Sequence, residues 1–140
     1  MRYAGAMAHW LDIRRAPFVT FTFPSTYTYE QLDAEFCYLE AYYAEVAAKT
    51  TGPVGLLVDA TAVSKSSARN RKRIVDSLAS VEPLLKARAV GQAYAISNPI
   101  ARGGLTAVLW LRQSPWPVKL FATRAEAEAW LSERFAEAAG

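Results

Sequence analysis

The stretch VGLLVD at residues 54–59 decides how the rest of this 140-residue sequence is interpreted. A short continuous apolar run, closed here by Asp59, is typical of a strand that is buried on both faces of its sheet. A glycine–proline pair stands directly before it, and a polar loop over residues 61–66 follows. Because both faces of such a strand must be covered by other elements, the run predicts an α/β domain.

The segments before this strand predict a hairpin and then an amphipathic helix. Residues 9–14 and 18–23 carry strand-like patterns on either side of a turn, which favours two antiparallel strands. Thr28 and Gln31 have the spacing of a capping box, which marks a helix N-terminus. The apolar residues that then recur at the helical period are Leu32, Phe36, Leu39, Tyr43 and Val46.

The segments after the central strand alternate helices with strands. A second helix is expected after the polar loop, and Pro83 is expected to end or kink it near Val81. The remaining elements are a strand over residues 89–96, a helix over 99–111, a strand over 118–121 and a helix opened by a capping box at Thr123 and Glu126.

The order is therefore ββαβαβαβα, which we assign to a single domain over residues 1–140. Strands that alternate with helices are parallel neighbours joined by right-handed crossovers. The predicted fold class is α/β, with a mixed five-stranded sheet, the first strand antiparallel and the rest parallel, and four helices. Ligands of open α/β sheets bind outside the carboxyl ends of the strands, so a site is expected on the loops over residues 59–67, 97–104 and 122–124.

The composition excludes several classes of protein. Apolar residues make up 52% and charged residues 21% of the chain, as in ordinary globular domains. No apolar run approaches the roughly 20 residues of a membrane span. The N-terminus lacks the apolar core of a signal peptide, and a single cysteine cannot form an internal disulfide, so we expect a cytoplasmic protein.

The reactive residues argue against catalysis. One histidine and one cysteine, far apart in the sequence, do not make a metal site. Neither a nucleophilic triad nor a phosphate-binding glycine motif is recognisable. We therefore expect no catalytic residue, no metal and no cofactor, and an enzyme is the least favoured class.

The strand Leu56-Leu57-Val58-Asp59, the loop in which Ser66-Ser67 opens a helix, and the closing segment VKLFATRAEAEAWL at residues 118–131 resemble one family. They are similar to the STAS domains (sulphate transporter and anti-sigma factor antagonist) and the wider superfamily around them. Together with the element order, the resemblance covers nearly the whole chain. It implies a STAS-like β-α superhelix and a regulatory module in signalling.

In anti-sigma factor antagonists, a serine at the start of this helix is phosphorylated by a partner kinase, which controls partner binding. The resemblance therefore implies Ser66 or Ser67 as the phosphorylated residue. Here the string is KSSA at residues 65–68, without the acidic residue and the glycine that usually surround that serine.

Polar residues at the end of the central strand are the first candidates for a site. Ser64, Ser66 and Ser67 lie at or just before a helix N-terminus. One of them is expected to be the N-cap, and the alternative is that they bind an anion there. Asp59 is expected to have a structural role, accepting hydrogen bonds from loop N–H groups.

Basic residues in the first two turns of the second helix are further candidates. Extending the apolar stripe backwards points Arg71 toward the end of the sheet and leaves Arg69 and Arg73 facing outward. Several cations near a helix N-terminus oppose the helix dipole, which favours a binding surface. The alternative is a solvated charged face.

The start of the third helix adds Asn98, Arg102 and Gly103. A glycine lets a ligand approach the backbone, and arginine is a bidentate partner for phosphate or carboxylate. Packing of the third helix, with Asn98 as its cap, is the alternative interpretation.

Two functional hypotheses follow. The first is a non-enzymatic regulatory or scaffolding module that binds a protein partner through the second helix and the loops at the carboxyl strand ends. The alternative is a protein that binds a small anion, a nucleotide or a lipid headgroup through Ser66, Arg71 and Arg102. The net charge of +3 is too modest to favour nucleic acid, and a homodimer stays open.

Overall fold

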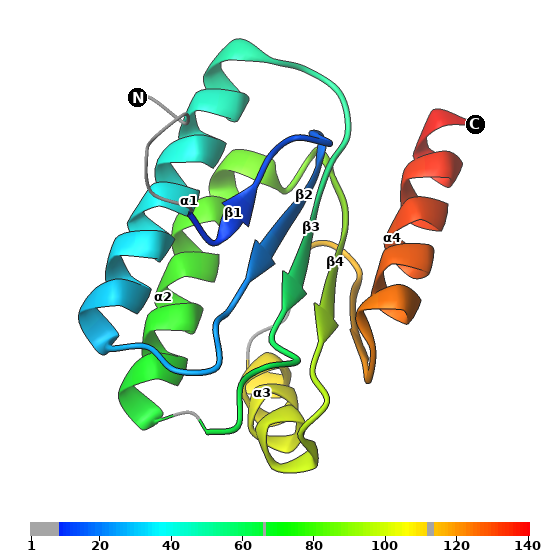
Figure 1. The fold of residues 1–140 in the computed structure, drawn as a ribbon. Helices are drawn as coiled ribbons and strands as arrows, with labels where there is room; N and C mark the ends of the chain where they lie inside the picture. The colour runs from blue at the N-terminus through cyan, green and yellow to red at the C-terminus, as the bar shows by residue number, and fades with distance from the viewer. Residues whose placement is uncertain (1–8, 66, 112–113) are drawn as a thin grey trace.

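The structure is a computed structural model that describes residues 9–65, 67–111 and 114–140, with the backbone alone for Val108, Trp110 and Leu111. Its elements follow the order predicted from the sequence (Figure 1). They are β1 (Leu11–Asp12), β2 (Phe18–Thr22), α1 (Tyr29–Lys49), β3 (Val54–Asp59), α2 (Ala68–Leu85), β4 (Ala89–Ala95), α3 (Pro99–Leu111), β5 (Val118–Phe121) and α4 (Arg124–Ala139).

The strands form one sheet in the order β1-β2-β3-β4-β5. β1 pairs antiparallel with β2, and β2, β3, β4 and β5 are parallel to one another. The register places Asp59 opposite Thr22 of β2 and Ala95 of β4, so the parallel strands end at a common edge. The predicted α/β class, the mixed five-stranded sheet and the strand directions are confirmed.

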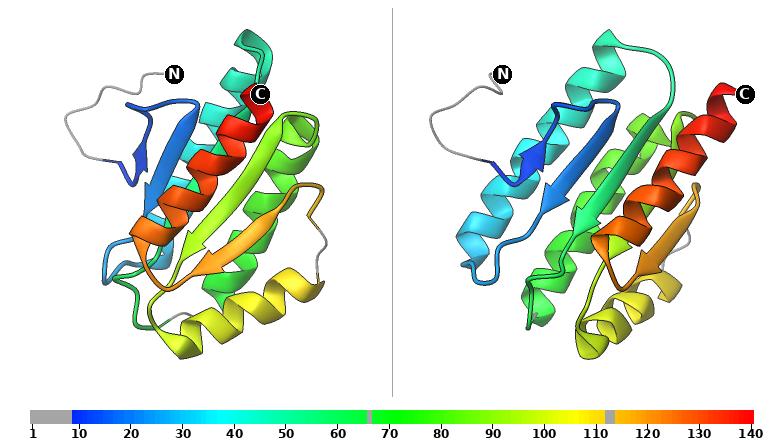
Figure 2. Two further views of the ribbon diagram at one scale, coloured as in Figure 1. Left: turned by 90° about the vertical axis from the view of Figure 1, so that its right-hand side faces the viewer. Right: turned by 45° about the vertical axis from the view of Figure 1, so that its right-hand side comes forward.

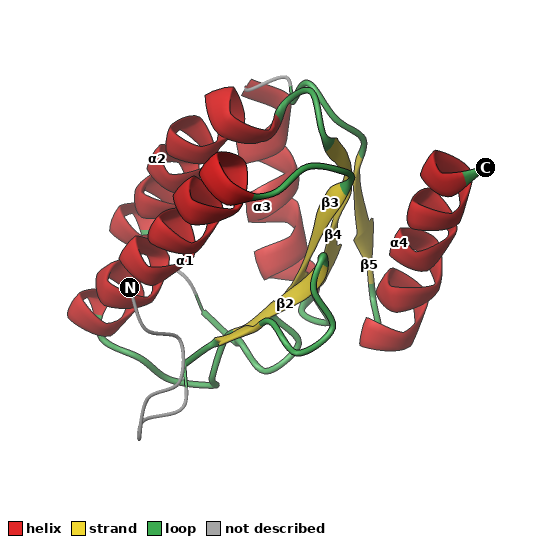
Figure 3. Ribbon diagram, turned by 90° about the horizontal axis from the view of Figure 1, so that it is seen from above, coloured by secondary structure: helices red, strands yellow, loops and turns green. Residues whose placement is uncertain are grey.

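The helices lie on both faces of the sheet. α1 and α2 run side by side along one face, and α4 lies alone on the other, where it contacts β3, β4 and β5 (Figure 3). α3 is on the same side as α1 and α2, and in both views of Figure 2 it lies beside the carboxyl ends of the strands. The position of α3 places its N-terminus at the edge where the sequence predicts a site.

Alternate residues of each strand supply two separate cores. The larger core lies under α1 and α2 and includes Phe21 of β2, Val58 of β3 and Tyr94 of β4. The smaller one lies under α4 and includes Leu57 and Ala93. Both cores therefore follow from the two-residue period of the strands.

Two expected boundaries differ from the structure by more than one residue. β1 has two residues, whereas the sequence predicted a strand over residues 9–14. α2 does not stop near Val81 but continues through Pro83 to Leu85. Val81 and Leu85 are both buried, so their packing holds the last turn although proline cannot donate a backbone hydrogen bond there.

No helix within the described residues is both long enough and apolar enough to cross a membrane.

Candidate functional site

The loops that lead into α2 and α3 meet at the carboxyl edge of the sheet. Asn98 Nδ2 donates a hydrogen bond to the Ser64 carbonyl oxygen at 3.2 Å. Further along the two helices, a Cβ added to Gly104 would lie 3.8 Å from Cδ of Arg71. The two segments that the sequence assigns to a shared edge are therefore in contact.

Ser67 and Asn98 cap the helices that begin there. Ser67 Oγ accepts a hydrogen bond from the Asn70 N–H at 3.0 Å. Asn98 Oδ1 accepts from the N–H groups of Ile100 and Ala101, at 2.9 and 3.1 Å. These oxygens thus satisfy donors that a helix N-terminus leaves without partners.

The side chains of the other polar candidates do not cap these helices. Ser64 and Gly103 are exposed, and a Cβ on Gly103 would meet nothing within 4 Å. Arg102 Nε is buried, and no described residue hydrogen-bonds it. Ser66, which carried both the anion-site and the phosphorylation hypotheses, lies outside the described residues.

Arg73 does not face outward, so that prediction was wrong. Its Nε donates to Asp33 Oδ1 at 2.7 Å and its Nη1 donates to Glu40 Oε2 at 2.9 Å, both on α1. Burial alone would lower the pKa of the Arg73 guanidinium, but the hydrogen bonds to Glu40 and Asp33 outweigh it and raise that pKa. Because α1 packs along this flank of α2, Arg73 joins the two helices instead of forming an outer surface.

The neighbouring basic residues of α2 have different positions. The Arg69 guanidinium lies over the Tyr29 ring, 3.6 Å from its centroid. Lys72 pairs with Asp76 one turn later, at 2.9 Å. Arg71 lines the cavity described below. The basic run therefore does not form one continuous patch.

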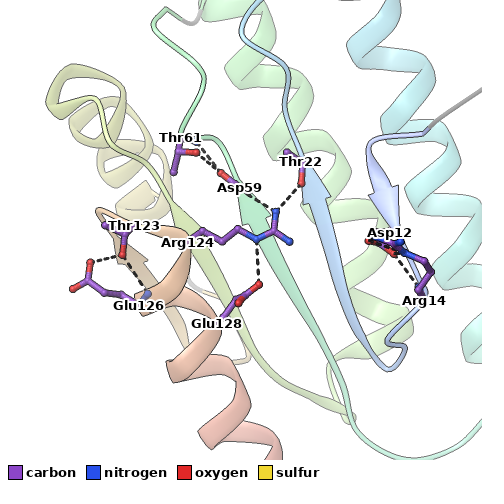
Figure 4. A network of polar contacts seen from close by, with 9 residues as sticks. All are labelled: Asp12, Arg14, Thr22, Asp59, Thr61, Thr123, Arg124, Glu126 and Glu128. Atoms are coloured by element: carbon purple, nitrogen blue, oxygen red, sulfur yellow. Dashed lines mark hydrogen bonds and ion pairs between the residues drawn. The ribbon is translucent and has the colours of Figure 1, made fainter.

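Asp59 belongs to the face that α4 covers. Its Oδ1 accepts from the N–H and the hydroxyl of Thr61, at 3.0 and 2.7 Å, and its Oδ2 accepts from Arg124 Nη1 at 3.2 Å (Figure 4). Arg124 also donates to Glu128 at 3.1 Å. The carboxylate connects the end of β3 to the first turn of α4, on the opposite face of the sheet from α2.

A cavity of about 150 Å³ lies between the sheet and the helices α1, α2 and α3. Its wall is mainly aromatic and aliphatic, with Phe36 and Tyr43 from α1, Leu78 from α2 and Leu105 from α3. Among the described lining residues, the exposed ones are Ser64, Lys65 and Ile100. All three lie at the carboxyl edge of the sheet, so the cavity opens there.

Besides Ser77 of α2, a buried polar cluster interrupts the apolar wall. Gln92 and Tyr94 extend from the same face of β4, and Trp116 precedes β5. Gln92 Nε2 lies 2.9 Å from Tyr94 Oη, and Trp116 Nε1 donates to Gln92 Oε1 at 3.2 Å. Burial raises the pKa of the Tyr94 hydroxyl, which is therefore protonated at neutral pH.

Sequence reasoning found neither the cavity nor this cluster. The available signal was Gln92, a polar residue inside the otherwise apolar strand AVGQAYA, two positions before Tyr94. A two-residue separation places both side chains on one face of a strand. Buried polar groups of this kind require partners, so the position deserved to be a candidate.

The comparisons with known proteins give no match: no family model, no curated protein and no solved structure is similar to this chain. In the part of the chain that the structure describes, no group of three or more histidine, cysteine, aspartate or glutamate side chains could hold a metal ion. The cavity and its edge are thus interpreted from their own chemistry.

Proposed function

We propose that this protein is a binding module that takes a small amphipathic anion into the cavity between the sheet and helices α1, α2 and α3. The observation that carries this proposal is an apolar cavity whose lining includes Lys65 and Arg71 at its open end. Apolar side chains favour a hydrocarbon group, and the two cations favour a carboxylate or phosphate at the mouth.

The size of the cavity limits the hydrocarbon group. An apolar cavity of about 150 Å³ holds a molecule of roughly the size of benzene. The buried part of the ligand is therefore a single ring or a short chain of about six to eight carbons. A complete nucleotide is too large and too polar for this interior.

The charged residues at the mouth act in different ways. Lys65 is exposed and supplies a point charge, and the half-buried Arg71 adds a second positive charge to the cavity wall. Ile100, which is 86% exposed, lies on the first turn of α3 and extends the apolar wall to the surface. A ligand with an apolar tail and an anionic head fits this order of residues.

The test is isothermal titration calorimetry with octanoate, 1-octanol and inorganic phosphate. We expect octanoate to bind, 1-octanol to bind more weakly, and phosphate alone to give no signal. Lys65→Gln should weaken octanoate binding by about threefold to tenfold, because a partly exposed charge pair contributes about 1 kcal/mol. It should leave the affinity for 1-octanol unchanged.

Lys86→Gln is the matched control, since Lys86 is an exposed lysine at the opposite end of α2. It should change none of the three titrations. If octanoate does not bind, or if both lysine variants have the same effect, the proposed function is wrong.

A protein partner at this edge is the second candidate function. The observation that favours it is the side chain of Ile100, which is 86% exposed and lines the mouth of the cavity together with Lys65. Arg73 no longer contributes to such a surface, because its guanidinium is held by Asp33 and Glu40. Failure of octanoate to bind in the titrations would favour this candidate.

We also propose that the domain is a STAS-like β-α superhelix. What supports this is the order of helices and strands along the chain, on which the resemblance is partly based. A regulatory role in signalling, and phosphorylation of Ser66 or Ser67, belong to the same proposal. Phosphorylation at Ser67 would modify the oxygen that now caps α2.

A further inference from the structure

The hydrogen-bonding capacity of Trp116 determines how the Gln92 amide is oriented. An indole N–H can only donate, and Trp116 Nε1 lies 3.2 Å from Gln92 Oε1. The oxygen of the amide must therefore face Trp116, and its nitrogen must face the other side. That side is occupied by Tyr94 Oη, 2.9 Å from Gln92 Nε2.

The orientation of the amide leaves two hydrogens without an acceptor. Because Gln92 Nε2 donates to Tyr94 Oη, the hydroxyl of Tyr94 accepts and its own proton must point elsewhere. Within the described part of the chain, the Tyr94 hydroxyl and the Gln92 amide make no hydrogen bonds besides these two. Tyr94 and Gln92 are 2% and 4% exposed, so bulk water does not satisfy them.

Both groups line the cavity, which gives these hydrogens a direction. A buried donor without a partner costs free energy, and such groups in native structures usually have a partner. Ser77 of α2 also lines the cavity and is buried, but in the described part of the chain no hydrogen bond joins it to the cluster, so we assign the partner to the occupant of the cavity.

We propose that the ligand carries an acceptor oxygen on its apolar part, held by the Tyr94 hydroxyl and the Gln92 amide. This inference rests on the proposed function, because it takes the cavity as the binding site. A ketone, ester or ether oxygen fits, since each accepts hydrogen bonds without bringing a charge into the interior. The ligand class is then an oxygenated amphipathic anion, with its head near Lys65 and its oxygen at β4.

The test compares two neutral probes, acetophenone and ethylbenzene, whose ring and side chain match except for the carbonyl oxygen. Their affinities are measured by NMR from the indole N–H signal of Trp116. If the cavity offered no hydrogen bond to replace those that the ketone loses in water, acetophenone would bind far more weakly than ethylbenzene. Because we propose that the Tyr94 hydroxyl and the Gln92 amide replace them, we expect acetophenone to bind the wild-type protein at least as tightly as ethylbenzene does.

Tyr94→Phe should weaken acetophenone binding by about tenfold, the amount that loss of one neutral hydrogen bond produces. The affinity for ethylbenzene should stay within about twofold, which also shows that the cavity of the variant is intact. Tyr27→Phe is the matched control, because Tyr27 lines the same cavity but does not belong to the cluster of Gln92, Tyr94 and Trp116. It should change neither affinity.

Each failure has a separate meaning. The acceptor proposal is overturned if the wild-type protein binds acetophenone much more weakly than ethylbenzene. It is also overturned if Tyr94→Phe leaves the ratio of the two affinities unchanged. Either result would mean that the ligand does not supply the missing acceptor, for example because a bound water does. The wild-type comparison decides this even if the variant does not fold. If the ketone result holds but octanoate does not bind, the anionic head is wrong and the acceptor site remains.

Discussion

Arg73 shows how one side chain changes its role once its neighbours are known. Its side chain is 10% exposed, and it hydrogen-bonds two carboxylates that lie 40 and 33 residues earlier in the chain. A buried cation is tolerated when its donors are paired in this way. Arg73 therefore stabilises the contact between α1 and α2 and does not belong to the binding surface.

Replacing Arg73 tests this assignment. Arg73→Met keeps the length of the side chain but leaves Asp33 and Glu40 without their cation. These carboxylates are 47% and 24% exposed, so water compensates in part, and we expect a loss of about 2 kcal/mol in the free energy of unfolding. Urea denaturation followed by circular dichroism measures it.

Lys72→Met is the control on the adjacent residue, where the ion pair with Asp76 is exposed on both sides. Such a pair contributes about 0.3–0.5 kcal/mol. Equal losses for the two variants would show that Arg73 has no special structural role.

At the scale of elements, the contact between α4 and the sheet depends on small residues in the strands. A Cβ on Gly55 of β3 would lie 2.8 Å from Cε2 of Phe135 and 3.2 Å from Cδ1 of Leu131. A Cβ on Gly91 of β4 would lie 3.0 Å from Cη2 of Trp130. The glycines thus let α4 approach closely enough to cover its face of the sheet alone.

Two glycine substitutions should have opposite signs. Gly55→Ala should lower the free energy of unfolding by about 1–2 kcal/mol, because Leu131 is fully buried and cannot move away. Gly103→Ala, in the open first turns of α3, should raise it by about 0.5–1 kcal/mol through helix propensity. Thermal or urea unfolding of both variants checks the pair. Unchanged or raised stability in Gly55→Ala would contradict the close approach of α4, and a loss in Gly103→Ala would contradict the open surroundings of that glycine.

Local signals predicted the elements but not all of their neighbours. The N-caps predicted at Thr28 and Thr123 appear in the structure, where each side-chain oxygen accepts from the N–H three residues on. Only Thr28 completes the capping box, because its own N–H donates to Gln31 Oε1, whereas Glu126 accepts from the Thr123 hydroxyl instead. The direction of Arg73 could not be predicted, because periodicity detects the apolar stripe of a helix and not the flank that a second helix covers. Its partners are far away in the sequence, and nothing in the local pattern connects them.

At the scale of the whole molecule, the cavity depends on how three helices are held relative to the sheet. The sequence predicted the edge at which a ligand would enter, because parallel strands bring their carboxyl ends together. It could not predict an empty volume, because the space between α2, α3 and β4 depends on the separation of elements and not on any single residue. Gln92 was visible as a polar residue, but its meaning required Trp116 and the cavity beside it.

An unfilled apolar cavity lowers the stability of a domain, so filling it should raise stability and impair binding together. Ala101 of α3 lines the cavity, and Ala101→Leu adds three carbons to that wall. We expect the free energy of unfolding to rise by about 1 kcal/mol and the affinity for octanoate to fall by about tenfold or more. Urea denaturation and calorimetry on the same sample measure both quantities.

Ala107→Leu is the control, because it makes the same change at an exposed position of α3. It should shift the free energy of unfolding by less than about 0.5 kcal/mol and leave the affinity for octanoate unchanged. If the Ala101→Leu variant is less stable and still binds octanoate with wild-type affinity, the ligand binds elsewhere. The added side chain would then have met packed atoms and not free space.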